Sequence, residues 1–455
     1  MSSTAHFIDG CISRHILRMS STTAASLLAV FAVDILTLVY VAMLHDTTLL
    51  AAVGIAKTLV FINSGLLSGL ILAAGALLSA RMGRGAASGR SRLVTNMLVL
   101  ATTLSTAVAL LELAIAWPIA AWFGADSAPW VAGRVFIAIT VPASVLHCTM
   151  QLCAQLLRAE GHSRLGLWVV LSGVATLAVA DPLLIFACGL GLKGAAIAYA
   201  LAALVALTVG LNAVGRRIGL SRKLRPKLFK LHARQLSSVA LPAMLGNLAM
   251  PFAVTYLLLT LASFGAPALA AMAVIDRLLQ FCYCLYFALP NALAPVLAQN
   301  LAAARDTRAR AAIGFTRQLV ILYGLAVWAM LELAAAPLAS VFGLPPEALP
   351  LFNAFCHFGA GLWVAFGLDF IALAMFITMG RAWWVAAFAW LRGTLGTLPF
   401  VYVGSRVNDG SGALLGMWVG NAMVAALSVA SAAAMAKTFF ARRAAAVSTV
   451  SSIQR

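Results

Sequence analysis

Ten ionisable side chains lie inside long apolar runs of this 455-residue chain, where a charge is costly. The acids are Asp34, Glu112, Asp181, Asp276, Glu332 and Asp369, and the bases are Lys57, Arg134, Arg277 and Arg392. Such groups carry protons, bind ions or pair with one another across neighbouring helices. The excess of acids over bases favours chemistry on cations: reversible protonation, ion binding or recognition of a positively charged molecule.

The composition places these side chains in a membrane protein. Hydrophobic residues make up 63% of the chain and charged residues 10%, whereas a soluble globular protein has about 25% charged residues. The mean hydropathy is +1.00. Because the bilayer core offers no hydrogen bonds to the backbone, the spanning segments must be helical. The sequence therefore predicts an all-α polytopic membrane protein.

Twelve apolar runs are long enough to cross a bilayer at about 20 residues per span. They cover residues 20–44, 49–80, 93–118, 129–157, 165–188, 194–215, 237–262, 267–299, 312–338, 348–379, 382–404 and 412–438. The segments between them alternate in charge, with 25 Lys and Arg residues in one set and two in the other. Because basic residues collect in cytoplasmic loops, we expect a multi-pass protein of the bacterial inner (plasma) membrane with both termini in the cytoplasm. This asymmetry accounts for the formal charge of +18 without a nucleic-acid partner.

The two halves of the chain repeat each other. Leu111–Ala114 is mirrored by Leu331–Ala334 at a separation of 220 residues. A polar stretch at about 216–236 divides the spans into two sets of six. Since six is even, both sets have the same orientation, which predicts two parallel six-helix repeats in lobes 1–225 and 226–455. Parallel repeats are typical of secondary transporters that bind their substrate where the repeats meet.

Four stretches carry a resemblance to a known family. They are Leu49–Gly54, Leu156–Arg164, Ala180–Ala198 and Pro290–Ala303. In order and spacing they resemble the multidrug and toxic compound extrusion (MATE) family over nearly the whole chain, and Ala180–Phe186 is the most specific piece. The resemblance implies two six-helix lobes around a central cavity. It also implies export of organic cations driven by a proton or sodium gradient, and no enzymatic activity.

The resemblance gives Asp181 a role in ion coupling. This residue matches the aspartate of the family's Leu-Asp-Pro motif in span 5, which is implicated in the proton-linked chemistry of one branch. A carboxyl group in a low-dielectric lobe can load and release a proton near neutral pH. The alternative is that Asp181 caps the turn before Pro182 and stays ionised.

Asp34 is the second candidate for ion coupling. Many family members have an aspartate in a Val-Asp-Thr motif of span 1, but that position falls near Thr37 here. Asp34 lies three residues earlier, so it can occupy the same helix face. Thr37 is then a candidate cavity residue. The alternative is that Asp34 only packs or caps. Leu177 also departs from the proton-linked branch, which usually has asparagine there.

The sodium-coupled branch of the family relies on a glutamate in span 7 and an aspartate in span 10. Span 7 has no acid here, and the expected position falls near Met250. Asp369 is in span 10 but about one turn away from the family position. We therefore favour protons over sodium as the coupling ion and keep Asp369 as a candidate for the substrate cavity or a secondary ion site.

Two pairs of charges occupy equivalent places in the repeats. Lys57 and Asp276 lie 219 residues apart, and Asp276 is also a candidate cavity residue. A pairing of Lys57 with Asp276 across the lobes would form an extracellular gate, and the alternative is separate pairing within each lobe. Glu112 and Glu332 also match by the repeat, which favours a structural role.

The sequence predicts proton-coupled antiport of small lipophilic or cationic molecules by a protein in contact with membrane lipids. We expect neither a cofactor nor a metal, because the seven cysteines lie mostly in apolar runs without metal-ligand spacing. A flippase or exporter of lipid-linked oligosaccharide or another metabolite, from the same superfamily, remains the alternative. An intramembrane acyltransferase would need a catalytic histidine, and neither His147 nor His357 belongs to a recognisable catalytic motif.

Overall fold

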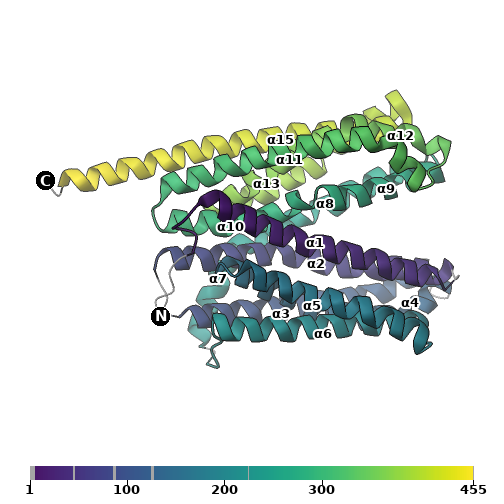
Figure 1. Cartoon of the computed structure of the whole chain (residues 1–455), viewed down its shortest axis with the longest axis horizontal. Coiled ribbons are helices and arrows are strands. Elements are labelled where there is room, and N and C mark those ends of the chain that lie inside the picture. Colours follow the sequence, from purple (N-terminus) through teal and green to yellow (C-terminus); the bar gives the residue numbers. More distant parts are fainter. Residues whose placement is uncertain (1–5, 45–46, 86–88, 124–127, 224, 454–455) are drawn as a thin grey trace. The chain divides into compact units, whose positions relative to one another are not determined.

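The computed structural model describes residues 6–44, 47–85, 89–123, 128–223 and 225–453, and these residues form helices and turns without a strand (Figure 1). By packing, the chain divides into two compact units. Unit 1 comprises Met1–His6 and Ser21–Met244, and unit 2 comprises Phe7–Ser20 and Leu245–Arg455. The division of the duplicated lobes at residue 225 remains a prediction, because these units follow packing and not the repeat.

Unit 1 is a bundle of long apolar helices. They are α1 (Ile12–Ala42) from Ser21 onward, α2 (Thr47–Gly83), α3 (Arg90–Phe123), α4 (Ala128–Ala159), α5 (Ser163–Pro182), α6 (Gly191–Arg217) and α7 (Pro226–Asn247) up to Met244. Helix α4 is central and packs against α2, α3, α5 and α6. Small residues allow close approach, as expected between helices in lipid: a Cβ added at Gly173 would lie 2.9 Å from the Cβ of Ala206.

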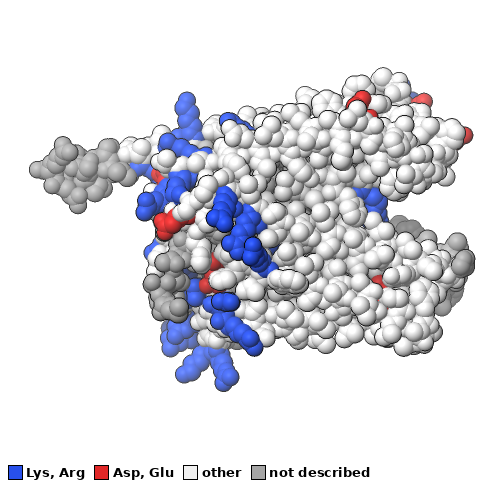
Figure 2. Space-filling model, in the orientation of Figure 1, with Lys and Arg blue, Asp and Glu red and all other residues white. Residues whose placement is uncertain are grey.

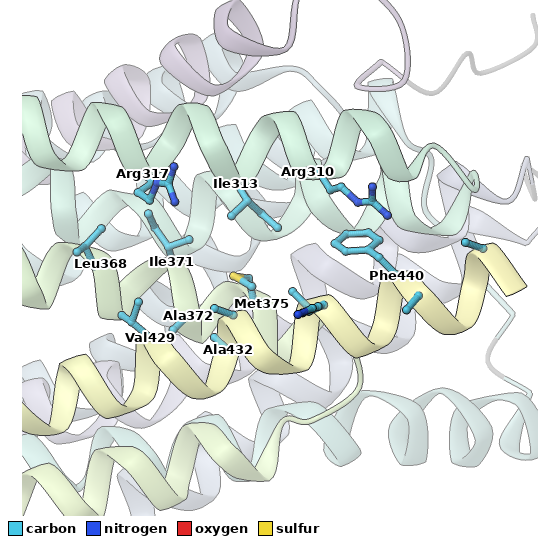
Figure 3. A pocket seen from close by; sticks show the side chains of 15 residues that line it. Arg310, Ile313, Arg317, Leu368, Ile371, Ala372, Met375, Val429, Ala432 and Phe440 are labelled. Carbon is cyan, nitrogen blue, oxygen red and sulfur yellow. The ribbon is translucent and has the colours of Figure 1, made fainter.

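Unit 2 contains the helices of the second half of the chain. They are α8 (Ala249–Ala262), α9 (Ala266–Cys282), α10 (Cys284–Ala302), α11 (Asp306–Val341), α12 (Leu349–Ala354), α13 (Ala360–Thr378), α14 (Trp383–Gly393) and α15 (Leu398–Ile453). Helix α13 packs against α10, α11 and α15. Phe355 and Trp418 contribute buried rings to this core, with 5.3 Å between their centroids. A groove runs between α11, α13 and α15 (Figure 3).

The segment assigned as α15 consists of two helices that double back on each other. The backbone leaves the helical region at Asn408–Asp409, where φ is −150° and then +47°. Beyond this turn the chain returns antiparallel, because a Cβ at Gly404 would meet the backbone of Gly412, and one at Gly416 would meet the carbonyl group of Phe400. Glycine at these positions lets the two helices touch backbone to backbone.

This hairpin accounts for the last two predicted spans. Among the described residues, ten helices are long and apolar enough to cross a membrane, or eleven if α9 and α10, which meet at 43°, are one bent span. One of these, Trp383–Ala445, contains the turn at Asn408–Asp409 and so provides two crossings. With α9 and α10 taken as one bent span and Trp383–Ala445 as two crossings, the described helices match the twelve predicted spans.

Charged residues are distributed unevenly along the helices. In each unit, most of the Lys and Arg side chains visible in Figure 2 gather toward one end of the bundle. The sides of the helices are largely uncharged, as a lipid-facing surface requires. This distribution agrees with the alternation read from the loops. The cytoplasmic location of both termini remains a prediction.

Candidate functional site

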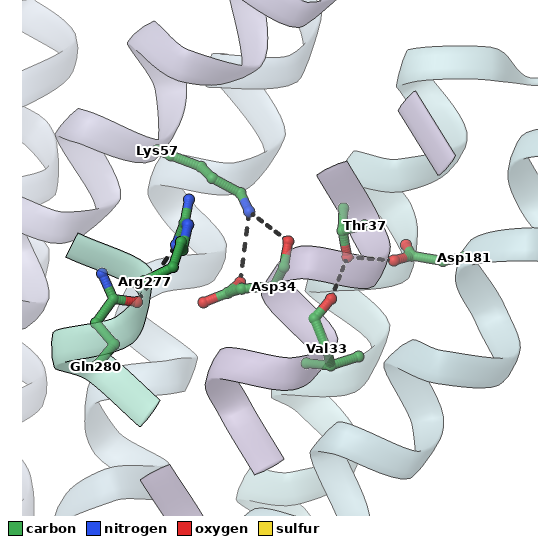
Figure 4. A network of polar contacts seen from close by, with 7 residues as sticks. All are labelled: Val33, Asp34, Thr37, Lys57, Asp181, Arg277 and Gln280. Carbon is green, nitrogen blue, oxygen red and sulfur yellow. Dashed lines mark hydrogen bonds and ion pairs between the residues drawn. The ribbon is translucent and has the colours of Figure 1, made fainter. Parts of the chain in front are cut away.

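Asp181 and Thr37 form a buried hydrogen-bonded pair in unit 1 (Figure 4). Thr37 Oγ1 on α1 donates to Asp181 Oδ2 on α5 at 2.5 Å. The same hydroxyl lies 3.1 Å from the carbonyl oxygen of Val33, one helical turn earlier. A hydroxyl has one hydrogen and cannot satisfy both acceptors fully. A proton on Asp181 removes the conflict, because the carboxyl then donates to Thr37 and Thr37 donates to Val33.

The second carboxyl oxygen of Asp181, Oδ1, is buried without a described hydrogen-bond partner. Asp181 is 0% exposed, and its Oδ1 has no hydrogen-bond partner among the residues that the structure describes. An ionised carboxyl buried in this way is costly, and the cost falls when a proton or another cation binds. The geometry therefore suits a group that exchanges one positive charge for another.

The backbone around Asp181 is irregular for a physical reason. Pro182 follows it directly and has no N–H group to donate to the preceding turn. The helix continues as a π-helical turn over Leu183–Ala187. Such turns are rare and occur often at functional sites, because they rotate side chains away from the regular helix register. The alternative role for Asp181, a cap on this turn, has no support among the described hydrogen bonds, in which its carboxyl group accepts from Thr37.

Asp34 forms an ion pair with Lys57 of α2, also in unit 1. Lys57 Nζ lies 3.5 Å from Asp34 Oδ1 and donates to the Asp34 carbonyl oxygen at 3.2 Å. Figure 4 shows this ion pair beside the Thr37–Asp181 pair. The side chains of Lys57 and Asp34 are 33% and 47% exposed, so the ion pair is far more accessible than Asp181. Both charges are close enough to act on Asp181. Thr37 makes the direct contact with Asp181, one turn from Asp34 on the same helix.

Two further polar side chains belong to this neighbourhood. The rings of His147 on α4 and Tyr199 on α6 stack with centroids 6.0 Å apart, and the charge of Asp34 acts on both. The Tyr199 hydroxyl has no hydrogen-bond partner in the described part of the chain. Sequence reasoning missed Tyr199 and considered His147 only as a catalytic histidine. Nothing in their spacing signals that α4 and α6 bring them together.

Asp369, the candidate ion ligand of unit 2, is held by a basic residue. Arg392 Nη1 on α14 donates to Asp369 Oδ2 on α13, and these side chains are 18% and 10% exposed. The guanidinium carbon of Arg392 also lies 5.5 Å from the centroid of the Phe366 ring, within cation–π range. The carboxyl group of Asp369 therefore already has a cation. A role as secondary ion site remains a prediction and would require Arg392 to release it.

We expect Arg392→Ala to destabilise unit 2 strongly. The substitution leaves Asp369 as a buried charge without its partner, which costs about 3–5 kcal/mol. The thermal midpoint of the purified protein should fall by roughly 6 °C or more. In the matched double variant, Arg392→Ala with Asp369→Leu, most of the loss should be recovered because no buried charge remains. An unchanged midpoint in Arg392→Ala would contradict this pairing.

The predicted gate residues have partners within their own units. Lys57 pairs with Asp34, and Asp276 Oδ2 accepts a hydrogen bond from Gln280 Nε2 at 2.6 Å. Gln280 also accepts from Arg277 at 3.3 Å (Figure 4). These contacts match the alternative of separate pairing within each lobe. A gate formed by Lys57 and Asp276 remains a prediction.

The repeat-related acids Glu112 and Glu332 have different environments. Glu332 Oε1 lies 2.7 Å from His357 Nδ1, with both side chains partly exposed. Glu112 is 7% exposed, and neither of its oxygens has a hydrogen-bond partner among the described residues. The equivalent positions have therefore diverged. The predicted structural role of this pair stays a prediction.

The stretch Leu156–Arg164 covers the end of α4, the loop outside the spans and the start of α5, and it contacts α1 and α3. Arg158 Nη2 donates to Ser26 Oγ at 2.9 Å, and Arg90 Nη1 lies 2.6 Å from Glu160 Oε1. Burial raises the pKa of Glu160 to about 7, although Arg90 and Arg217 act to lower it. Gly161 has a φ of +94°, which favours glycine. These contacts give the motif a structural function.

The Gln299–Asn300 pair in unit 2 holds the beginning of the described chain. The backbone N–H of Phe7 donates to Gln299 Oε1 at 2.5 Å, and Asn300 Nδ2 donates to the Phe7 carbonyl oxygen at 3.1 Å. Arg308 adds hydrogen bonds to the carbonyl groups of Phe7, Asp9 and Gly10. This second motif is therefore also structural. No pattern in the sequence predicts this contact, because it joins residues 292 positions apart.

Many membrane-spanning helices, with a buried carboxyl–hydroxyl pair and paired charges inside the spans, are features of a membrane transport protein. The MatE family model matches residues 23–183 and 242–403, once in each half of the chain. The chain therefore belongs to the MatE family, as its motifs predicted. Its members are transporters and not enzymes, so the acyltransferase alternative is set aside.

The chain is also similar to individual relatives and, in its fold, to a solved structure. The chain is 37% identical over 234 residues to an uncharacterized 21 kDa protein from Pseudomonas savastanoi, covering 50% of this chain and 75% of that protein. It is 30% identical over 199 residues to an FAD transporter from Shewanella oneidensis, covering 42% of this chain and 44% of the transporter. The fold is similar to that of a mutant of the Vibrio cholerae MATE transporter VcmN, with a TM-score of 0.89 and 21% identity over 97% of this chain and 100% of that one.

Proposed function

We propose that this transporter exports small lipophilic cations in exchange for protons, and that Asp181 carries the coupling proton. The observation that supports this proposal is the buried pair of Asp181 with Thr37. One oxygen of the carboxyl group contacts a hydroxyl whose hydrogen has two acceptors, and the other oxygen has no described partner. Both features favour a carboxyl group that gains and loses a proton.

Exchange follows from competition for one negative charge. When Asp181 loses its proton, a charge appears in a buried part of unit 1, within range of the Asp34–Lys57 pair. A substrate cation near this cluster compensates the charge. A proton on Asp181 neutralises the carboxylate and so lowers the affinity for the cation. Because such coupling is reciprocal, the substrate weakens proton binding as much as the proton weakens substrate binding. With alternating access, this competition gives antiport.

Protons are favoured over sodium because of the environment of the available acids. Sodium coupling of the kind that the family resemblance implies needs an acid in span 7, and residues 226–262 contain none. Asp369, the acid of span 10, already pairs with Arg392. Among the described residues, Asp181 is not paired with a basic residue in this way, so it stays available to bind a proton.

The similarity to an FAD transporter favours a second candidate, the export of an anionic dinucleotide or another metabolite. Such a substrate would need uncompensated positive charge in the spans. Of the four bases in the spans, Lys57 and Arg392 instead each pair with an acid, Asp34 and Asp369, and Arg277 lies close enough to Asp276 to act on its charge. This neutralisation is why we place cation export first. A flippase for lipid-linked oligosaccharide would need the same positive charge for its pyrophosphate group.

We further propose that the transporter resides in the bacterial inner membrane with both termini in the cytoplasm. The support is the concentration of 25 basic residues in one set of loops against two in the other. In this orientation, the coupling proton enters from outside the cell when the external pH is the lower one.

An accumulation assay separates these candidates. Cells that express the chain should accumulate less ethidium than cells with an empty vector, and a proton uncoupler should remove the difference. In the same cultures, the FAD content of the medium should not rise. Release of FAD without any effect on ethidium would favour the second candidate. An ethidium difference that survives the uncoupler would contradict proton coupling.

A further inference from the structure

Unit 2 contains a groove of about 530 Å³ between α11, α13 and α15, and none of the acids discussed above lines it. Its wall is mainly aliphatic, with Ile371 and Met375 from α13 and Val429 from α15 (Figure 3). Alanines on α15, such as Ala432 and Ala436, line the groove, and their short side chains leave it open. The groove is therefore a surface for a flexible apolar chain.

The length of the groove matches one leaflet of a bilayer. Its lining on α15 runs from Val429 to Ala444, which corresponds to roughly 22 Å at 1.5 Å per residue. Half of the hydrocarbon core is about 15 Å thick. An acyl chain that lies along the wall can therefore reach from the middle of the bilayer to the level of the headgroups.

Three basic side chains line the same groove. They are Arg310 and Arg317 on α11 and Lys437 on α15, and all three belong to exposed residues. The guanidinium carbon of Arg310 lies 4.6 Å from the centroid of the Phe440 ring, so an aromatic side chain orients it (Figure 3). None of the described residues that line the groove is acidic.

The acid nearest in sequence to these bases is already neutralised. Asp306, at the start of α11, pairs with Arg443 at 3.1 Å, and Arg443 does not line the groove. In the described structure, Arg310, Arg317 and Lys437 form no ion pair with an acid. The groove thus combines an apolar wall with uncompensated positive charge near the end of the helices, where basic pockets in membrane proteins recognise anionic headgroups.

We propose that this groove is a binding site for an anionic phospholipid. One acyl chain lies along the aliphatic wall, and the phosphate group binds Arg310 and Lys437 beside Phe440. Arg317 is two turns deeper on α11, about 10 Å along the helix, and extends its guanidinium group toward the headgroup region as long basic side chains do near membrane interfaces. The site requires both parts of the ligand, the chain and the anion.

The test uses the full-length transporter in detergent micelles with defined lipids. Native mass spectrometry should show retained dioleoyl phosphatidylglycerol in excess of dioleoyl phosphatidylcholine, which has the same chains without net charge. The triple variant Arg310→Gln, Arg317→Gln, Lys437→Gln should retain at least tenfold less phosphatidylglycerol, since each basic contact contributes roughly fivefold. The control is a triple variant of exposed basic residues outside the groove, Arg305→Gln, Arg381→Gln, Arg442→Gln, which should retain phosphatidylglycerol as the unmodified protein does.

Two further measurements test the apolar part of the site. Ala436→Phe fills the groove without a change of charge and should also reduce phosphatidylglycerol retention. Glycerol phosphate, the headgroup chemistry without chains, should not displace the lipid. Equal retention of the two lipids, or equal loss in the two triple variants, would overturn the proposal. Displacement by glycerol phosphate would replace it with a free-phosphate site.

Discussion

Asp181→Asn should abolish efflux while the protein remains folded in the membrane. Asparagine has almost the shape of aspartate and can still accept the hydrogen bond from Thr37, so packing between α1 and α5 should persist. It cannot release a proton, and the charge for which protons and substrate compete never appears. We expect the transport rate to fall by roughly 100-fold or more, the scale on which proton-transfer groups contribute.

Two controls make this result specific. Glu112→Gln removes another buried acid of unit 1, one for which a structural role is predicted, and it should leave efflux intact. The amount and the thermal midpoint of Asp181→Asn in membranes should equal those of the unmodified protein. Efflux at the normal rate in Asp181→Asn would remove this residue from the mechanism. Equal loss in Glu112→Gln would show that any buried acid of the unit has the same effect.

The spans could be predicted because hydropathy reports the solvent around each segment and needs no knowledge of packing. The clearest case is the hairpin at Asn408–Asp409, where two apolar runs are separated by a short polar turn. The bend between α9 and α10 and the π-helical turn after Pro182 could not be predicted. Each lies within a single apolar run whose hydropathy stays high on both sides of the irregularity, so the hydropathy pattern does not mark its place.

The candidate site was only partly predictable, because helix periodicity gives a face but not a partner. Asp34 and Thr37 are three residues apart, which leaves their directions about 60° from each other around the helix. That difference is enough for Thr37 to contact Asp181 while Asp34 contacts Lys57. Pairs such as Asp369 with Arg392 depend on how helices pack, and no spacing in the sequence encodes that.

We expect protons, and not sodium ions, to drive export. Asp181 with Thr37 provides a buried place for one proton, whereas the acid of span 10 is held by Arg392 and span 7 has no acid. A proton that enters from the acidic side should therefore be both necessary and sufficient to drive the substrate in the opposite direction. Sodium should have no effect on the rate at a fixed pH gradient.

The most direct measurement uses inverted membrane vesicles without sodium, in which a pH gradient with the acidic side inside the vesicle corresponds to acid outside the cell. This gradient should drive ethidium into the vesicles with the unmodified protein and not with Asp181→Asn. A sodium gradient of equal size, at the same pH on both sides, should drive none. Uptake that requires sodium and ignores the pH gradient would contradict the account and make Asp369 the leading ion ligand.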